Sequence, residues 1–274
     1  MKDFNKARKI EFNGRETYHW ITWTKELKKN FVVMYPGSSM NSSSMEKLEK
    51  MINDAGHPTL MIEPDWMNSD LNYFSNDLSA VIKKEGIEKP ILLGQSAGYM
   101  VIIDYICKTN NADKVIGTCC SPKFSETGKN KLYFYIFDKI LRYSGYLGSA
   151  YMNIRHKIKK EKRGYRDYST LEGKKDIPHV WLSMTDVPFS YITEDIHNGR
   201  KIIKWDITQQ LKEIDKDMPL IYGNSDMLVT PRAGEYIKKS AKKANCTIKV
   251  IDGSHSLPTT KPKELMEAIK EYLI

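Results

Sequence analysis

A serine set between two glycines is the first group in this sequence that could do chemistry. Residues 94–98 read G-Q-S-A-G, after a short apolar run and before a helix-like run. The spacing matches the G-x-S-x-G pattern, in which a strand turns sharply into a helix and exposes the serine hydroxyl. Glycine fits positions 94 and 98 because side chains would collide where strand and helix nearly touch. Ser96 is therefore a candidate nucleophile, although the same residues would also serve as a strand end and a helix cap.

A serine hydroxyl is a poor nucleophile near neutral pH, so a base and an acid that orients the base must accompany it. In a parallel α/β sheet, such side chains lie at the carboxyl ends of strands. Asp226 and His255 each follow an apolar, strand-like run late in the chain. Asp252 is a rival acid, but it stands only three residues before His255 and is expected to open a turn. We therefore predict a catalytic triad of Ser96, His255 and Asp226.

The elements that would position these groups alternate between strand and helix. Such alternation predicts a mostly parallel sheet with helices on both faces. The first two strands are joined at Asn13-Gly14, a dipeptide typical of hairpin turns, and His19 is expected to be a strand side chain. Strands are expected at 9–12, 17–24, 31–35, 57–62, 90–93, 114–120, 218–222 and 246–251, and helices at 44–55, 71–85, 99–108, 231–243 and from 262 onward.

Between residues 123 and 217 the alternation is lost, and several helix-like pieces follow one another. A segment of this length is too long for a plain loop inside a compact domain. We interpret it as an inserted helical cap. The predicted organisation is a core built from residues 1–122 and 218–274, with a cap of residues 123–217 between its two parts.

The order of serine, acid and histidine, each just beyond a strand, resembles that of the α/β-hydrolase superfamily. The resemblance covers both core segments, about two thirds of the chain, and is weak in the cap. It implies the α/β-hydrolase fold and a serine hydrolase that cleaves carboxylic esters through an acyl-enzyme. Ser96 would attack the carbonyl, His255 would take and return the proton, and Asp226 would hold the imidazole. This chemistry requires no metal and no organic cofactor.

The same resemblance implies an oxyanion hole, in which backbone N–H groups hold the negative charge of the attacked carbonyl. One donor would be Ala97, next to the nucleophile. The second would come from the loop after the strand at 31–35, where the family commonly carries His-Gly and this chain instead has Pro-Gly. Ser38 is the expected second donor, with Ser39 as the alternative. Asp65 follows a proline as in the family and is expected to be structural.

The predicted cap contains an aromatic stretch at 132–137 and a basic stretch at 155–166. Apolar residues at helical spacing are usually packed core, and charged runs usually face solvent, which is the interpretation we favour. The alternative is an aromatic roof over an apolar acyl pocket, with a basic flank that contacts an anionic membrane surface or attracts anionic substrates. Three histidines of this segment are expected to have structural or substrate-side roles (His156, His179 and His197).

Composition sets further expectations. Of the 274 residues, 41% are hydrophobic and 28% are charged, as in an ordinary globular protein. The net charge is +9, but no recognisable nucleic-acid-binding motif accompanies it. The four cysteines form no C-x-x-C pair, so we expect free thiols rather than disulfides or a metal site. The first residues lack the apolar core of a signal peptide and no apolar run would span a membrane, so we expect a cytoplasmic location.

Other functions stay open on the sequence alone. The same triad would cleave an amide or peptide bond, and only leaving-group preference separates that activity from ester hydrolysis. A protein that merely binds a ligand on a hydrolase scaffold is a further interpretation, since a fold does not decide function. The intact triad argues against it, because binding does not require all three groups. Dehalogenase and epoxide-hydrolase chemistry is less favoured, because it resembles cases with an aspartate where Ser96 stands.

Overall fold

The computed structural model describes residues 7–12, 15–24, 29–38, 40, 42–64, 70–124, 202, 204–226 and 228–274. All structural statements below concern these residues. Several positions discussed above lie outside them, namely the hairpin turn at Asn13-Gly14, Ser39, Asp65, and residues 125–201 of the expected cap with its three histidines. The helical cap and its aromatic roof therefore stay predictions.

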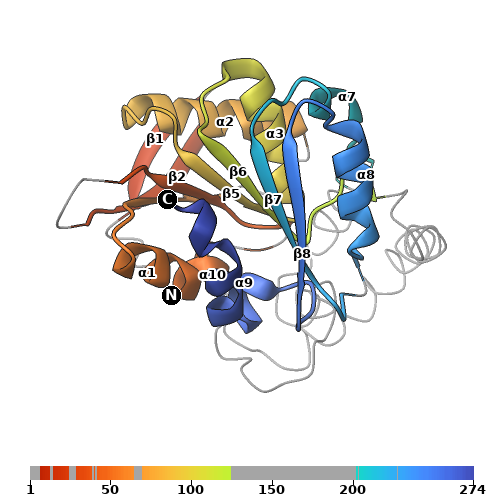
Figure 1. Ribbon diagram of the computed structural model, residues 1–274. Helices are drawn as coiled ribbons and strands as arrows, with labels where there is room; N and C mark the ends of the chain where they lie inside the picture. Colours follow the sequence, from red (N-terminus) through yellow and green to blue (C-terminus); the bar gives the residue numbers. More distant parts are fainter. Residues whose placement is uncertain are drawn as a thin grey trace, which may run out of the picture.

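The described strands form one eight-stranded sheet in the order β1-β2-β4-β3-β5-β6-β7-β8 (Figure 1). The pairs β1–β2 and β2–β4 are antiparallel, and the other pairs are parallel. The mostly parallel sheet and the N-terminal hairpin are thus confirmed. The strands are β1 (Arg8–Phe12), β2 (Arg15–Thr22), β3 (Val32–Tyr35), β4 (Thr59–Glu63), β5 (Ile91–Gln95), β6 (Lys114–Thr118), β7 (Asp217–Gly223) and β8 (Asn245–Ile251).

Helices cover both faces of the sheet, and β3 shows why they must. Successive side chains of a strand point to opposite faces. Val32 and Met34 lie in one hydrophobic cluster, whereas Val33 and Tyr35 lie in another, and all four side chains are fully buried. A strand that is apolar on both sides is stable only where both faces are covered, so the continuous apolar run predicts a two-sided core correctly.

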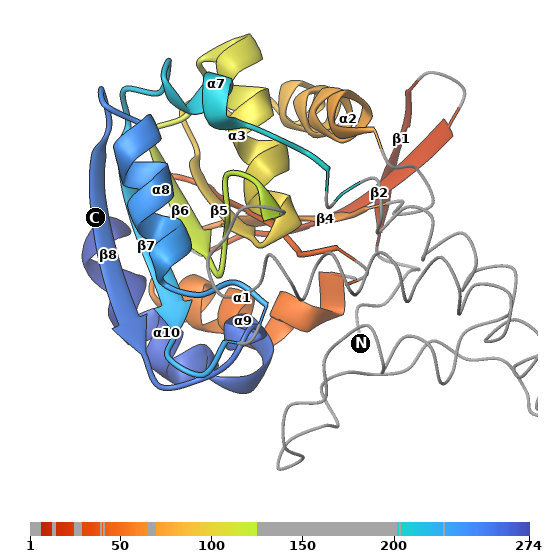
Figure 2. The ribbon, with the colours of Figure 1, turned by 90° about the vertical axis from the view of Figure 1, so that its right-hand side faces the viewer.

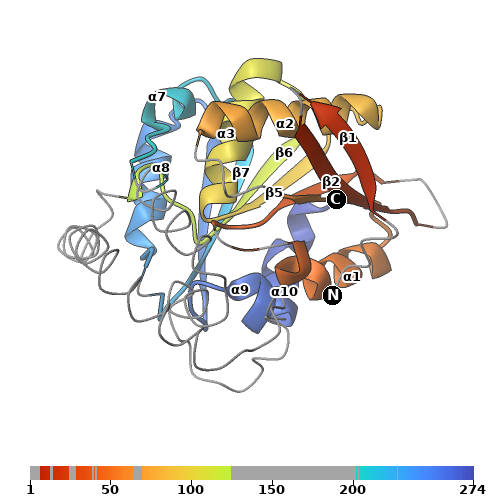
Figure 3. The same cartoon turned by 180° about the vertical axis from the view of Figure 1, so that it is seen from behind.

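The helices lie in two layers, one on each face of the sheet, as Figures 1 and 2 show from two directions. Figure 3 gives the same layers from behind. One face carries the 3₁₀ turn η2 (Ser42–Met45), α1 (Glu46–Asp54), α9 (Leu257–Thr260) and α10 (Pro262–Ile269), and the 3₁₀ turn η6 (Lys270–Tyr272) ends the chain. The other face carries α2 (Leu71–Lys84), α3 (Ala97–Thr109), α7 (Thr208–Leu211) and α8 (Arg232–Ser240). No helix in these ranges is both long and apolar enough to cross a membrane.

α3 is the helix that follows the serine motif, and it lies in the middle of its layer. Every residue from Ala97 to Ile106 is buried. A helix that is apolar on all sides needs neighbours on all sides, and α3 contacts α2, α7 and strands β3, β5 and β6. The first turn of α3 is therefore held rigidly against the sheet, which fixes the residues at its N-terminus.

Some element boundaries differ from the prediction. The strand expected at 114–120 ends at Thr118, because Cys119 adopts a left-handed backbone conformation with φ of 47°. The helix expected to reach residue 243 ends at Ser240, because the next residue, Ala241, leaves the helical region with ψ of 64°. α9 was not expected, since four residues are too short to show a helical period.

Residues 204–216 fall within the expected cap but pack against the core. The rings of Trp205 and Phe74 meet edge to face, with 5.8 Å between their centroids. The backbone N–H of Ile207 donates to the carbonyl of Pro122, 3.0 Å away. The two ends of the predicted insertion therefore lie side by side on the core, and the domain division itself stays a prediction.

Candidate active site

Ser96 occupies a strained turn between β5 and α3. Its backbone has φ of 50° and ψ of −117°, a combination that costs roughly 1–3 kcal/mol for a residue with a side chain. A Cβ atom on Gly94 would lie 2.6 Å from Cα of Tyr99, and one on Gly98 would lie 2.4 Å from the carbonyl oxygen of Pro36. Both distances are shorter than any real carbon contact. For Gly94 this is the expected collision between strand and helix, whereas a side chain on Gly98 would meet the backbone of Tyr35 and Pro36 at the end of β3.

This geometry predicts whether a substitution at Gly98 raises or lowers the free energy of unfolding. Alanine is favoured over glycine inside a helix by about 1 kcal/mol, so helix propensity alone would stabilise Gly98→Ala. The contact with Pro36 opposes this, and we expect unfolding free energy to fall by about 3 kcal/mol or more. Chemical denaturation measures the change. Gly86→Ala is the control, since its added Cβ meets nothing within 4 Å and only its φ of 65° carries a cost. A Gly98→Ala variant as stable as the native chain would contradict the clash.

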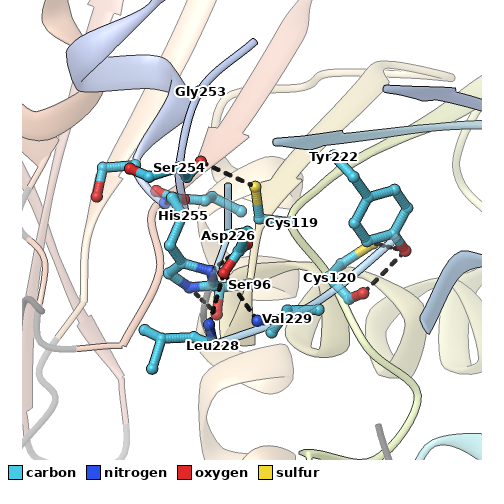
Figure 4. A network of polar contacts seen from close by, with 12 residues as sticks. Ser96, Cys119, Cys120, Tyr222, Asp226, Leu228, Val229, Gly253, Ser254 and His255 are labelled. Atoms are coloured by element: carbon cyan, nitrogen blue, oxygen red, sulfur yellow. Dashed lines mark hydrogen bonds and ion pairs between the residues drawn. The ribbon is translucent and has the colours of Figure 1, made fainter. Parts of the chain in front are cut away.

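The side chains of Ser96, His255 and Asp226 follow three different strands and lie in a row (Figure 4). Nε2 of His255 lies 3.0 Å from Oγ of Ser96, and Nδ1 of His255 lies 2.8 Å from Oδ2 of Asp226. His255 follows β8 and Asp226 follows β7, so all three stand at the carboxyl edge of the sheet. The structure thus brings together the three residues that the sequence singled out, while their catalytic roles stay a prediction.

The loops after β7 and β8 are held against each other by close backbone contact. A Cβ on Gly223 would lie only 2.3 Å from the carbonyl oxygen of Gly253. That same carbonyl accepts hydrogen bonds from the backbone N–H and the hydroxyl of Ser225, at 3.0 and 2.7 Å. Gly253 itself has φ of 153°, which favours glycine. These contacts fix the acid-bearing loop beside the histidine-bearing loop.

Asp226 is placed to carry a negative charge. Its side chain is fully buried, and Oδ1 accepts hydrogen bonds from the backbone N–H groups of Leu228 and Val229, at 2.7 and 2.8 Å. Burial alone raises the pKa of this carboxyl, but the charge and hydrogen bond of His255 and the two N–H groups outweigh it, so the pKa lies below its usual value. The rival Asp252 is exposed and faces Lys261 at 3.6 Å.

Comparison with known proteins bears on the fold. No family model matches this chain, and no curated protein sequence does. Solved structures do match it. An α/β-hydrolase enzyme from a Medee basin deep-sea metagenome library has a TM-score of 0.69 at 14% identity, covering 97% of each chain. An esterase from Exiguobacterium antarcticum has a TM-score of 0.67 at 15% identity, covering 94% of this chain and 95% of its own. The enol-lactonase from Burkholderia xenovorans has a TM-score of 0.69 at 14% identity, covering 97% and 99%.

The chain has the α/β-hydrolase fold. These identities are low, so the likeness establishes the architecture and not the activity. Within this fold, the sequence resemblance placed a serine, an acid and a histidine at the carboxyl edge of the sheet, and the structure has them there.

Ala97 directly follows Ser96, and the loop that carries Ser38 passes near it. Ala97 is the first residue of α3, and the first N–H groups of a helix have no acceptor within it. Gly37 precedes Ser38 in the loop after β3, and a Cβ on Gly37 would lie 3.3 Å from Cβ of Ser96. The β3 loop therefore passes next to the serine. The roles of Ala97 and Ser38 as donors stay predictions of the α/β-hydrolase resemblance.

Cys119 is a neighbour of the triad that sequence reasoning missed. Its thiol lies 3.7 Å from the carbonyl oxygen of Ser254, and burial together with the charge of Asp226 raises its pKa well above the usual value. Sγ of Cys119 and the ligand atoms of Asp226 and His255 all lie within 4.8 Å of one another, and these residue types suit zinc. However, the carboxylate oxygens of Asp226 already accept three hydrogen bonds. We therefore interpret the cluster as a triad with an adjoining protonated thiol.

Gln95 is the second residue that the sequence interpretation passed over. Its side chain is fully buried, and Nε2 donates to the backbone carbonyl of His255 at 3.0 Å. Oε1 is also buried and has no hydrogen-bond partner among the described residues. An unpaired buried acceptor costs about 1–3 kcal/mol. No local sequence signal marks this contact, because the G-x-S-x-G pattern leaves the position before the serine open.

The remaining described histidines lie away from this edge. His19 is fully buried on β2, where Nε2 lies 2.7 Å from Oε1 of Glu85, and burial lowers the pKa of its imidazole. Nδ1 of His57 lies 3.0 Å from the backbone carbonyl of Asn30. His19 is thus a strand side chain in a structural contact, as predicted.

Proposed function

We propose that this chain is a serine hydrolase that cleaves carboxylic esters. The observation that carries the proposal is the continuous hydrogen-bonded row from Asp226 through His255 to Ser96, ending on a serine held in a strained turn. Strained backbone of this kind is retained where the surrounding structure supports a function. A binding site would need neither the strain nor the buried, ionised acid behind the imidazole.

The geometry supports acyl transfer in two steps. Oγ of Ser96 attacks the ester carbonyl carbon as Nε2 of His255 takes its proton, and Asp226 stabilises the resulting imidazolium. The backbone N–H groups of Ala97 and Ser38 would hold the oxyanion. His255 then gives its proton to the departing alcohol oxygen, which leaves an acyl group on Ser96. A water molecule, deprotonated by His255, attacks this acyl group and releases the carboxylic acid.

The choice of esters over amides has two supports. Alcohols are better leaving groups than amines, so cleavage of an ester depends less on protonation of the leaving group by His255 than cleavage of an amide does. Two of the structurally similar proteins are described as an esterase and an enol-lactonase, and both names refer to ester bonds. We also propose an apolar acyl group as the preferred substrate part, from the aromatic stretch at 132–137.

Matched substrates test this function. We expect the native chain to hydrolyse p-nitrophenyl esters faster than p-nitroanilides of the same acyl group, and octanoyl faster than acetyl esters. Rapid mixing should show a burst of nitrophenolate where deacylation is the slower step. Faster cleavage of the anilides would indicate an amidase. A folded chain that turns over none of these compounds would contradict hydrolase activity, and equal rates with both acyl groups would contradict the acyl preference.

A further inference from the structure

We propose that Gln95 is a positioning residue that holds the backbone of His255 at the distance from Ser96 that proton transfer requires. The inference rests on the proposed function, because it concerns the reaction of the same serine. It goes beyond the triad in assigning a role to a side chain that never touches the substrate. Nothing in the G-x-S-x-G pattern specifies the residue at this position.

The contact between Gln95 and His255 has one chemically sensible orientation. A backbone carbonyl can only accept a hydrogen bond, so the amide nitrogen of Gln95, not its oxygen, must face the carbonyl of His255. The observed Nε2 to O distance is 3.0 Å. His255 is therefore held twice, at its carbonyl by Gln95 and at its ring by Ser96 and Asp226. Because Gln95 and Ser96 are consecutive residues, this hydrogen bond links the backbone segment of the nucleophile to that of the base.

The side chain of Gln95 lies between the β3 loop and the β8 loop. A Cβ on Gly37 would lie at an ordinary van der Waals distance of 3.5 Å from Cδ of Gln95, so this side chain borders the β3 loop. The amide reaches the His255 carbonyl on its other side. Gln95 thus spans the space between the loop expected to supply an oxyanion donor and the loop that supplies the base.

Packing alone does not explain a glutamine here. Oε1 is buried without a hydrogen-bond partner in the described part of the chain, whereas an apolar side chain of the same length would bury no polar atom. Buried polar groups with an unmet hydrogen bond are rare in native structures and call for a reason. Residues that break a local rule of stability are expected at functional sites. The hydrogen bond that the amide does make is the one from Nε2 to the His255 carbonyl.

The test compares Gln95→Met with Gln95→Glu and the native chain. Methionine keeps the length but removes both polar atoms, and glutamate keeps the shape but replaces the donor with an oxygen that faces the His255 carbonyl. For Gln95→Met we expect kcat to fall by about 10- to 100-fold, the scale of a misplaced catalytic group. KM should change by less than about twofold, because no substrate contact is lost. Tm should stay close to that of the native chain, because removing the unpaired Oε1 offsets the loss of the hydrogen bond to the His255 carbonyl. Gln95→Glu should be at least as slow.

Labelling of Ser96 by a fluorophosphonate gives a second readout, since it depends on the serine and its base and not on an ester substrate. We expect Gln95→Met to be labelled more slowly by a factor similar to its loss in kcat. Gln210→Met is the matched control. Gln210 lies on α7, where its Nε2 is 3.5 Å from Oδ1 of Asp104, and its variant should keep native kcat and native labelling.

The outcomes separate this inference from the proposed function. A native chain that is not labelled overturns the proposed function and this inference with it. Native labelling of both the native chain and Gln95→Met overturns the inference alone. A loss of kcat in Gln95→Met that is matched by a lower Tm, with labelling unchanged, shows a structural role and also overturns it. Slow labelling with unchanged Tm supports it.

Discussion

Replacing Ser96 with alanine should lower kcat/KM for an ester by roughly 10⁴- to 10⁶-fold, the scale seen when a triad nucleophile is removed. The loss is large because Oγ forms the covalent bond to the acyl group, and this oxygen lies 3.0 Å from Nε2 of His255. The native fold should survive, because alanine removes only the hydroxyl oxygen and adds no atom at this buried position. Steady-state kinetics, with circular dichroism as a check on folding, measures both quantities.

Ser240→Ala is the matched control for Ser96→Ala. Ser240 is the last residue of α8 and is not one of the three residues of the triad, so its variant should keep native activity. Residual hydrolysis by Ser96→Ala above about one hundredth of the native rate would show that another group attacks the ester. That result would remove Ser96 from the proposed mechanism.

Replacing Asp226 with asparagine should lower kcat by about 10⁴-fold, the loss that follows when the acid of such a triad is exchanged for an amide. An amide does not hold Nδ1 of His255 protonated in the same way, so Nε2 no longer faces Ser96 as a base. The rival acid supplies the control. Asp252 is exposed and faces Lys261, so Asp252→Asn should keep native kcat. Equal losses in the two variants would contradict the assignment of Asp226 as the acid.

The same variant has a pH-dependent effect on stability. The pKa of Asp226 is lower in the folded chain than its usual value, so the carboxylate stabilises the native state at pH values above its unfolded pKa. This contribution is lost as the pH falls through the folded pKa. We therefore expect the difference in unfolding free energy between the native chain and Asp226→Asn to be largest near neutral pH and to shrink below about pH 4. A difference that grows on acidification would contradict the direction of the shift.

Much of the sheet could be predicted from the sequence because its signals are local. The apolar run ending at Tyr35 is buried on both sides, so its composition alone indicates a covered strand. Gly94 likewise reflects a contact between the two elements it joins, whereas the close contacts of Gly98 are with Tyr35 and Pro36 of another strand and its loop. The positions of Asp226 and His255 followed from a rule about strand ends, and that rule needs no knowledge of distances.

The neighbours of the triad could not be predicted because their signals are not local. Gln95 meets His255 across 160 residues of sequence, and Cys119 lies near Asp226 only because β6 and β7 are adjacent in the sheet. The left-handed conformation that ends β6 occurs at a cysteine, whereas glycine and asparagine are the residues that usually indicate it in a sequence. α9 lies between β8 and α10, and its four residues are too few to show the hydrophobic period of a helix in the sequence.

The most direct measurement is the location of a covalent label. The native chain is treated with a fluorophosphonate, digested, and analysed by tandem mass spectrometry. One phosphonyl group per chain, attached to Ser96 and absent from Ser96→Ala, is the expected result. A label on any other residue, or an unlabelled chain that is folded by circular dichroism, would contradict a nucleophilic Ser96 activated by His255.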